Sequence, residues 1–280
     1  MMAKTKKRYM VVFSDVHGNY EALKAVMRKV NTKEVEKTIC LGDVIGYGPD
    51  PVRCWNVICG KCDIILKGNH EAIAIGEIDS SSCSELGRIS SSWTKSRIDH
   101  TILTHMKQLP DIYQVDRMLF CHSGCTKEGQ WVYYNDVCKL VGEFADQEAD
   151  IIFTSHTHRP RIVILDKNRN VVLDQYIKKD KTKFDIDLSQ NKVIINTGSV
   201  GQQRDNITDA AFVYCYMEGK NLHLCYRRIG YNRFLTYIKT VYYGAGKKVA
   251  NYLIRENWRR KIYESVADWG KWLFGRLCKR

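Results

Sequence analysis

The sequence of 280 residues predicts an α/β fold in which two β-sheets pack face to face with helices outside. The first part of the chain alternates short apolar strands with amphipathic helices, which is typical of βαβ units and a mostly parallel sheet. From residue 112 onward most predicted elements are short strands. Apolar residues make up 44% and aromatic residues 11% of the chain, enough to bury a substantial core.

Apolar runs and helical periodicity locate the elements of the first part. The predicted strands are Tyr9–Asp15, Thr38–Asp43 and Asp63–Lys67. One helix is predicted at Tyr20–Val30, and another begins over Pro51–Ile58, behind a Gly-Tyr-Gly-Pro-Asp turn. Residues 72–110 contain no predicted strand and are expected to be helical, with a turn at Ser80–Ser84.

The second part is rich in strands, with one clear helix at Asp136–Phe144. Its predicted strands are Tyr113–Gln114, Met118–His122, Asp150–Ser155, Arg161–Leu165, Val171–Tyr176, Lys192–Asn196, Ala211–Met217 and Asn221–Arg227. Lys178–Lys183 is predicted to be a charged, solvated hairpin turn. Helices are expected at Asn232–Tyr243 and Ala245–Glu256, separated by Gly244.

The net charge of +13 is concentrated near the end of the chain. Residues 231–280 hold 12 Lys and Arg against 3 Asp and Glu, a net charge of +9, whereas the first 230 residues hold 32 against 28, or +4. A basic segment of this kind favours an anionic partner such as phospholipid or nucleic acid. No apolar stretch reaches the roughly 20 residues of a membrane span, and Tyr9–Phe13 is too short for a secretory leader. We therefore expect a cytoplasmic protein.

Eleven scattered cysteines, several of them inside apolar runs, are expected to be buried, reduced thiols. Cys59 and Cys62 form a lone Cys-x-x-Cys pair. A redox role or half of a zinc site is the alternative, but no second pair follows at zinc-ribbon spacing.

Seven side chains of metal-ligand type follow five of the predicted strands. They are Asp15, His17, Asp43, Asn69, His122, His156 and His158. The members of each His or Asp pair two residues apart would project to the same side of an extended chain. Two carboxylates, one amide and four imidazoles suit two divalent ions of hard to borderline character. Any one of these sequence fragments could have a purely structural role. Five fragments, each following an apolar strand, would rarely arise by chance.

We expect Asp15, His17 and His158 to hold one ion, Asn69, His122 and His156 to hold the other, and Asp43 to bridge them. A hydroxide held between ions roughly 3.5–4 Å apart would attack phosphorus in line. His70 is not needed as a ligand and would protonate the leaving alkoxide. Arg204 is expected to bind a phosphoryl oxygen through its planar guanidinium.

At these residues the chain resembles the calcineurin-like metallophosphoesterase superfamily. The Asp-x-His, Gly-Asp, Gly-Asn-His, single His and His-x-His blocks follow in the order of that family. A small prokaryotic phosphodiesterase and phosphatase branch is especially similar. The segments that carry this similarity are Tyr47–Pro51, Trp93–Arg97, Asn196–Gly201 with Gln203–Asp205, and Gly230–Tyr231.

The resemblance covers about residues 9–259. It implies a four-layer αββα sandwich of two mixed β-sheets, the ligand roles given above, and Asn19 and Arg204 as substrate-binding residues. It also implies two divalent or trivalent ions, with Mn or Fe expected and Zn, Ni and Co as alternatives.

Departures from the family pattern narrow the expected function. Gly46 and Tyr47 stand where protein phosphatases carry Asp and Arg, which argues against a Ser/Thr protein phosphatase. Ser155 replaces the usual glycine before His-x-His, Thr197 replaces a usual proline, and the glycine at position 124 is one place later than usual. The expected function is hydrolysis of a small phosphorylated substrate: a phosphodiester, a dinucleoside polyphosphate or a phosphomonoester. The alternative is a catalytically silent scaffold of the same fold, tethered by its basic tail.

The expected organisation is a domain over residues 1–229 with a helical, lid-like insertion at 71–112. Residues 230–259 would form a helical part of the same domain, and residues 260–280 a basic amphipathic extension. The simplest role of that extension is a terminal helix packed on the core or on a second subunit of a homo-oligomer. The alternative is an interfacial helix in which residues 258–280 bind an anionic membrane surface on the inner side.

Overall fold

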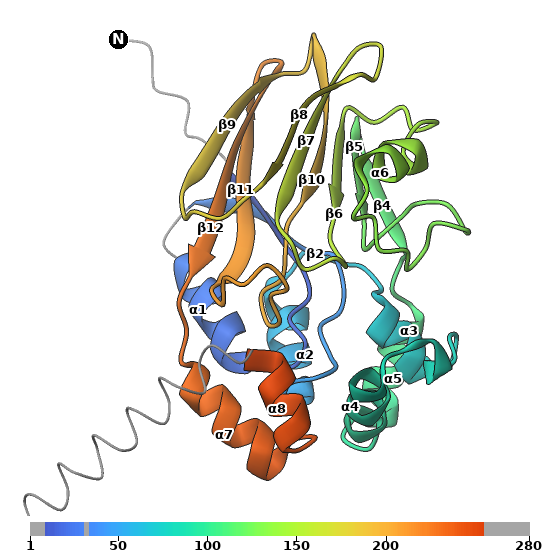
Figure 1. The fold of residues 1–280 in the computed structure, drawn as a ribbon, viewed down its shortest axis with the longest axis vertical. Coiled ribbons are helices and arrows are strands. Elements are labelled where there is room, and N and C mark those ends of the chain that lie inside the picture. Colours follow the sequence, from blue (N-terminus) through green and yellow to red (C-terminus); the bar gives the residue numbers. More distant parts are fainter. Residues whose placement is uncertain (1–8, 31–33, 255–280) are drawn as a thin grey trace, which may run out of the picture.

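The computed structural model describes residues 9–30 and 34–254, and its strands form two sheets of six strands each (Figure 1). The strands of the first sheet are β1 (Tyr9–Phe13), β2 (Val35–Cys40), β3 (Ile64–Ile65), β9 (Thr182–Asp187), β11 (Ala210–Glu218) and β12 (Asn221–Ile229). Those of the second sheet are β4 (Ile112–Val115), β5 (Met118–Cys121), β6 (Ile151–Thr154), β7 (Arg161–Asp166), β8 (Val171–Tyr176) and β10 (Asn191–Asn196).

Both sheets are mixed. The first has the order β3-β2-β1-β11-β12-β9, in which β1, β2 and β3 are parallel and the remaining pairs are antiparallel. The second has the order β4-β5-β6-β10-β7-β8, with β5, β6 and β10 parallel. The alternation of strands and helices therefore predicted the parallel part of the first sheet correctly, but the sheet as a whole is not mostly parallel.

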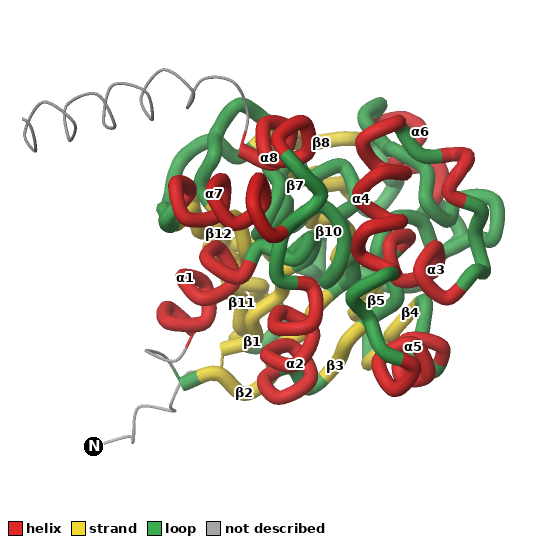
Figure 2. Tube along the Cα trace, turned by 90° about the horizontal axis from the view of Figure 1, so that it is seen from below, coloured by secondary structure: helices red, strands yellow, loops and turns green. Residues whose placement is uncertain are grey.

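The described helices flank these sheets and extend from one end of them (Figure 1). Their bounds are α1 (Tyr20–Val30), α2 (Pro51–Lys61), α3 (Asn69–Ile75), α4 (Glu85–Lys95), α5 (His100–Lys107), α6 (Val137–Glu143), α7 (Arg233–Tyr243) and α8 (Lys247–Ile254), with a short 3₁₀ turn at Ser80–Ser82. Seen from below, α7 and α8 lie on one side and α3, α4 and α5 on the other, with loops between them (Figure 2).

Three apolar clusters show that the molecule has four layers. Val11 and Phe13 point from β1 toward α1 and α2, whereas Val12 points the other way, into the space between the sheets. There it belongs to a cluster with Phe120 and Phe153 of the second sheet. The outer face of that sheet packs on α6. The layers are therefore α1 and α2, the first sheet, the second sheet and α6, as the αββα prediction required.

One strand was missed, and for an identifiable reason. Strand β9 begins at Thr182, inside the segment predicted to be a charged hairpin turn. Among the described strands it lies at the edge of the first sheet and pairs with β12 alone. Its alternating pattern is short, because only Phe184 and Ile186 are apolar and charged residues precede, separate and follow them, so the segment resembles a polar turn.

Several predictions fall on parts of the chain that are not described. The 260–280 extension and most of the membrane-binding segment 258–280 lie outside the described residues. The division into domain, insertion and extension, the homo-oligomer and the membrane partner stay predictions. In the described ranges, no helix combines the length and apolarity that crossing a bilayer requires.

The core between the sheets supplies a test of the fold. Phe153 is fully buried and stacks on Phe120 with ring centroids 4.9 Å apart. We expect Phe153→Ala to lower the free energy of unfolding by about 3–5 kcal/mol, because the substitution removes apolar contacts and leaves a cavity. Urea denaturation measures the change. Val172→Ala, on β8 with a relative exposure of 63%, is the control and should stay within about 0.5 kcal/mol of wild type. Equal stabilities of the two variants would contradict the proposed core.

Candidate metal centre

Six of the seven ligand-type side chains, all except Asn69, come together where the carboxyl ends of the central strands meet. Asp15 and His17 follow β1, and Asp43 follows β2, its parallel neighbour. In the second sheet, His122 follows β5, while the His156 and His158 pair follows the parallel strand β6. Asn69 is the first residue of α3. Parallel strands place their carboxyl ends at one edge, which is where α/β sheets form binding sites.

The local geometry differs from the extended chain expected for the two pairs of ligands. Asp15, His17, His156 and His158 have positive φ angles of 54°, 48°, 61° and 58°, and Asp43 has 53°. Each is therefore in the left-handed region, in a turn after its strand. Non-glycine residues adopt this region uncommonly, and such positions concentrate at functional sites.

One nitrogen of each imidazole in the centre is paired with a backbone carbonyl oxygen. The pairs are His17 Nδ1 with Ile45 O (3.1 Å), His122 Nδ1 with Leu41 O (2.9 Å), His156 Nε2 with Trp131 O (3.0 Å) and His158 Nδ1 with Gln202 O. A carbonyl oxygen only accepts, so the nitrogen facing it carries the proton. The opposite nitrogen of each neutral ring then presents a lone pair to the interior of the site.

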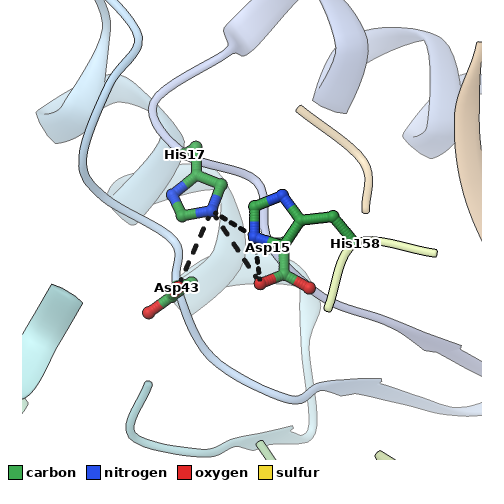
Figure 3. A group of neighbouring side chains, drawn as sticks. All are labelled: Asp15, His17, Asp43 and His158. Atoms are coloured by element: carbon green, nitrogen blue, oxygen red, sulfur yellow. Dashed lines mark hydrogen bonds and ion pairs between the residues drawn. The ribbon is translucent and has the colours of Figure 1, made fainter. Parts of the chain in front are cut away.

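The inward atoms form two groups that share one carboxylate. Ligand atoms of Asp15, His17, Asp43 and His158 lie within 4.8 Å of one another, and so do those of Asp43, His122 and His156. Figure 3 shows the first group, with the four side chains directed toward a common centre. Asp43 Oδ2 lies 3.7 Å from His17 Nε2 and 3.4 Å from His122 Nε2, which places this oxygen between the groups.

These atoms fit cations better than they fit one another. His17 Nε2 faces His158 Nε2 at 3.2 Å, and His122 Nε2 faces His156 Nδ1 at the same distance. Two lone pairs so close repel unless a proton or a cation lies beside them. Moreover, the buried oxygens Asp15 Oδ1 and Asn69 Oδ1 have no hydrogen-bond donor among the described residues. Such unpaired buried groups are costly, and divalent ions would satisfy them.

The electrostatics of the centre support the same conclusion. Burial acts to raise the pKa of Asp15, but His158 and His122 hold it below its ordinary value. Burial acts to lower the pKa of His122, but Asp43 and Asp15 raise it to about 9, while burial lowers the pKa of His156 to about 3. The carboxylates therefore favour positive charge beside the facing nitrogens of His122 and His156, which a bound ion would supply.

Glu71 organises the loops that carry two of the ligands, and the sequence analysis did not identify it. Its buried carboxylate accepts backbone N–H bonds from Asp43 (2.7 Å), Val44 (2.9 Å), Ile45 (3.2 Å) and Gly68 (2.9 Å). One side chain thus fixes the Asp43 turn to the start of α3. A Glu three residues after a helix N-cap is a recognised capping signal, and it was present in Gly-Asn-His-Glu.

His70 lies beside the ligands without being a member of either group. Its backbone N–H donates to Asp43 Oδ1 at 2.8 Å, and its ring centroid lies 4.8 Å from that of His17. Gly46, with φ +93°, packs directly against His70 Nδ1, so a Cβ at this position would collide with the imidazole. This close approach, together with the positive φ, accounts for a glycine at position 46.

The two predicted substrate-binding residues differ in their surroundings. Arg204 lies over the Tyr133 ring, and its backbone N–H donates to the carbonyl oxygen of His158, so it is close to the centre. Both ends of the Asn19 amide, in contrast, have protein partners: Nδ2 donates to Gly201 O and the Tyr231 hydroxyl, and Oδ1 accepts from Ala22 N and Thr236 Oγ1. These contacts give Asn19 a structural role, and its predicted substrate contact stays a prediction.

Two tyrosine rings pack against the histidines of the centre. Tyr133 stacks on the His156 ring with centroids 4.1 Å apart, and Tyr47 contacts the rings of His17 and His70 at 4.9 and 5.0 Å. Sequence reasoning did not identify Tyr133, because no motif marks it and only the fold brings it to His156.

Comparison with known proteins places this geometry in context. A model of the calcineurin-like phosphoesterase family matches residues 9–195. The uncharacterized protein MJ0912 of Methanocaldococcus jannaschii is 30% identical over 245 residues, which cover 84% of this chain and 93% of that protein. A metallophosphoesterase from Sphaerobacter thermophilus has a similar fold, with a TM-score of 0.74 at 24% identity over 88% of this chain and 98% of that one. The hypothetical protein PH1004 from Pyrococcus horikoshii does too, with a TM-score of 0.65 at 13% identity and the same coverage.

The role of Glu71 can be tested without reference to activity. In Glu71→Gln, the amide NH₂ group replaces one carboxylate oxygen and faces two backbone N–H donors. We expect the free energy of unfolding to fall by about 1–3 kcal/mol, because buried donors lose their acceptor. Thermal and urea unfolding measure the loss, with the exposed Glu128→Gln as the matched control. Unchanged stability of Glu71→Gln would show that these bonds do not hold the loops.

Proposed function

Because the chain belongs to the calcineurin-like phosphoesterase family, whose members are metal-dependent phosphoric ester hydrolases, we propose that it hydrolyses small phosphate esters with two divalent ions. The substrates in this proposal are phosphodiesters, dinucleoside polyphosphates or phosphomonoesters. Manganese or iron is the proposed native metal.

The observation that carries this proposal is the inward convergence of two buried carboxylates and four imidazole lone pairs in two groups that share Asp43. Asp15, His17 and His158 would hold one ion, and His122, His156 and Asn69 the other. The ions would supply a nucleophile at neutral pH, by lowering the pKa of water, and would stabilise charge on the phosphoryl oxygens. Because the fold fixes the positions of the seven side chains, it would also fix where the two ions lie.

His70 is the proposed general acid. It is bound to Asp43 through its backbone and lies against His17, but it is not a member of either ligand group. Its imidazole can therefore transfer a proton without giving up a metal. Protonation of the leaving oxygen prevents a strongly basic alkoxide from forming as the ester bond breaks.

Arg204 is the proposed phosphate-binding residue. Its backbone N–H donates to His158 O at 3.2 Å, which ties its loop to a ligand. The guanidinium is held by Gln202 Oε1 at 3.2 Å and by the face of Tyr133. A planar guanidinium held in this way can donate hydrogen bonds to two oxygens of one phosphoryl group.

The metal stoichiometry tests the shared site. We expect about two equivalents of Mn²⁺ per chain after reconstitution, and fewer than one in Asp43→Asn, because both groups lose the same ligand. Inductively coupled plasma mass spectrometry after gel filtration gives the count, and Asp146→Asn, an exposed residue, should retain the wild-type value. A full complement of metal in Asp43→Asn would contradict a bridging role.

The role of His70 can be tested through the leaving group. We expect His70→Ala to lower kcat about 10²–10⁴-fold for an alkyl phosphate ester at unchanged metal content. The loss should be much smaller for a p-nitrophenyl ester, because nitrophenolate leaves without a proton. Steady-state kinetics on both esters, with His100→Ala as control, measure the difference. Equal losses on both esters would exclude His70 as the general acid.

A further inference from the structure

Helix α7 directs its apolar side away from the protein. The side that packs on the protein carries Thr236 and Thr240, which are fully buried. At 3.6 residues per turn, the opposite side carries four large side chains, which together are called the α7 face: Phe234, Leu235, Ile238 and Tyr242. A surface helix ordinarily directs its apolar side toward the core. The reversed orientation of α7 therefore indicates that this face has a partner.

The α7 face is part of a local concentration of exposed apolar and aromatic side chains. Phe234 and Leu235 are 47% and 42% exposed, and Tyr242 and its neighbour Tyr243 are 74% and 71% exposed. In the described ranges twelve large side chains of this kind are exposed, and four of them belong to this one helix. Single exposed apolar side chains are ordinary, but a cluster of them marks an interaction site.

The charges around the α7 face are basic. Helices α7 and α8 contain four Lys or Arg and no Asp or Glu. Arg233 and Lys239 are paired with acids of other elements. Lys247 and Lys248 are exposed at the start of α8, where Glu85 lies 4.0 Å from Lys248, an exposed and therefore weak ion pair. The helix pair thus presents positive charge beside its apolar face.

A groove of about 500 Å³ adjoins the C-terminal end of α7, apart from the cavity of about 460 Å³ beside the general acid. Tyr243, the last residue of α7, lines this groove together with Arg53 of α2 and Arg97, which follows α4. Helices α2, α4 and α7 lie at the same end of the molecule (Figure 1). Asp50, the acid in the lining, is paired with a lysine of α7. We call this feature the arginine groove.

Both guanidinium groups of the arginine groove are available to an anion. Arg53 lies 3.6 Å from the centroid of the Tyr20 ring, and Arg97 lies 5.5 Å from that of Trp93. Stacking on a ring orients a guanidinium but leaves its N–H groups free to donate in the plane. Within the described part of the chain, neither group has an ion pair or a hydrogen bond. Two oriented, unpaired guanidinium groups beside one groove favour phosphate groups.

We propose that the α7 face and the arginine groove bind the surface of an anionic phospholipid membrane. Helix α7 would lie in the plane of the membrane, with its apolar face between the head groups and the acyl chains. Tyr242 and Tyr243 combine an apolar ring with a hydroxyl group, which suits that region. Lipid phosphates would be bound by Arg53 and Arg97.

The distribution of charge favours a membrane over two other occupants of the α7 face. A second copy of the chain docked through the same face would bring two basic helix pairs together. Residues 255–280 lie outside the described residues, and they hold eight Lys and Arg against three Asp and Glu. Placed on α7, they would add like charge. Attraction to anionic lipid, in contrast, increases with each Lys or Arg near the membrane surface.

Co-sedimentation of the full-length protein with vesicles tests the α7 face. At low salt, the wild type should sediment with vesicles of phosphatidylcholine and phosphatidylglycerol in equal parts, and not with phosphatidylcholine alone. The double variant Phe234→Ser with Leu235→Ser should lower the partition coefficient at least about tenfold, because apolar contact with the membrane is lost. It should stay folded by circular dichroism, since both side chains are exposed. Val171→Ser with Val172→Ser, two exposed valines of β8, is the matched control and should bind like wild type.

The arginine groove is tested by removing one charge. Arg97→Gln should weaken binding to the anionic vesicles about fivefold, because one cation near the lipid phosphates is lost. Lys220→Gln removes the same charge from the turn before β12, at the opposite end of this strand from α7, and should bind like wild type. Added salt should weaken the binding of every protein in the series.

Three results would overturn the proposal. The first is a wild type that does not sediment with the anionic vesicles. The second is equal sedimentation of Phe234→Ser with Leu235→Ser, which would assign the binding to another part of the chain. The third is a dimer in sedimentation velocity without lipid that the same double variant converts to a monomer, which would assign the α7 face to a second copy of the chain.

Discussion

Four hydrogen bonds from imidazole N–H groups to backbone carbonyl oxygens determine which ring nitrogens face the interior of the centre. Because the carbonyls of Ile45, Leu41, Trp131 and Gln202 only accept, His17, His122, His156 and His158 must direct lone pairs inward. Two carboxylates converge on the same space. The paired nitrogens 3.2 Å apart and the unpaired oxygen of Asp15 are then consequences of one constraint. The described residues supply no hydrogen-bond donor to this oxygen, whereas metal ions bound in the centre would satisfy it.

The fold positions these groups because the carboxyl ends of strands from both sheets meet at the centre. Strands β1 and β2 lead into the turns with Asp15, His17 and Asp43, while β5 and β6 lead into those with the other histidines. A dry core around Phe120 and Phe153 fixes the two sheets relative to one another. The carboxylate of Glu71 then connects the Asp43 turn to the start of α3 through four backbone bonds. The positions of the ligand residues therefore depend on packing between distant elements and, locally, on the buried carboxylate of Glu71.

The sequence predicted the layers of the fold, and it singled out the six carboxylate and imidazole side chains that the structure brings together, because each follows an apolar strand and has distinctive chemistry. It predicted the local geometry of the His and Asp pairs wrongly, since left-handed turns depend on contacts that alternation along a strand does not encode. Strand β9 was missed because its period is brief and its residues are charged. Packing between elements distant in sequence produces three further features: the hydrogen bonds at both ends of the Asn19 amide, the stacking of Tyr133 on His156 and the cavity beside His70. No local sequence pattern indicates them.

The most direct test of the two-metal centre is anomalous X-ray diffraction from crystals grown with Mn²⁺, recorded on both sides of the manganese absorption edge. Two anomalous peaks should appear, one beside Asp15, His17 and His158 and the other beside Asn69, His122 and His156. Asp43 should contact both. A single peak shared by the two groups, or peaks elsewhere with the inward nitrogens left unligated, would contradict the assignment of these residues as the ligands of a metal pair.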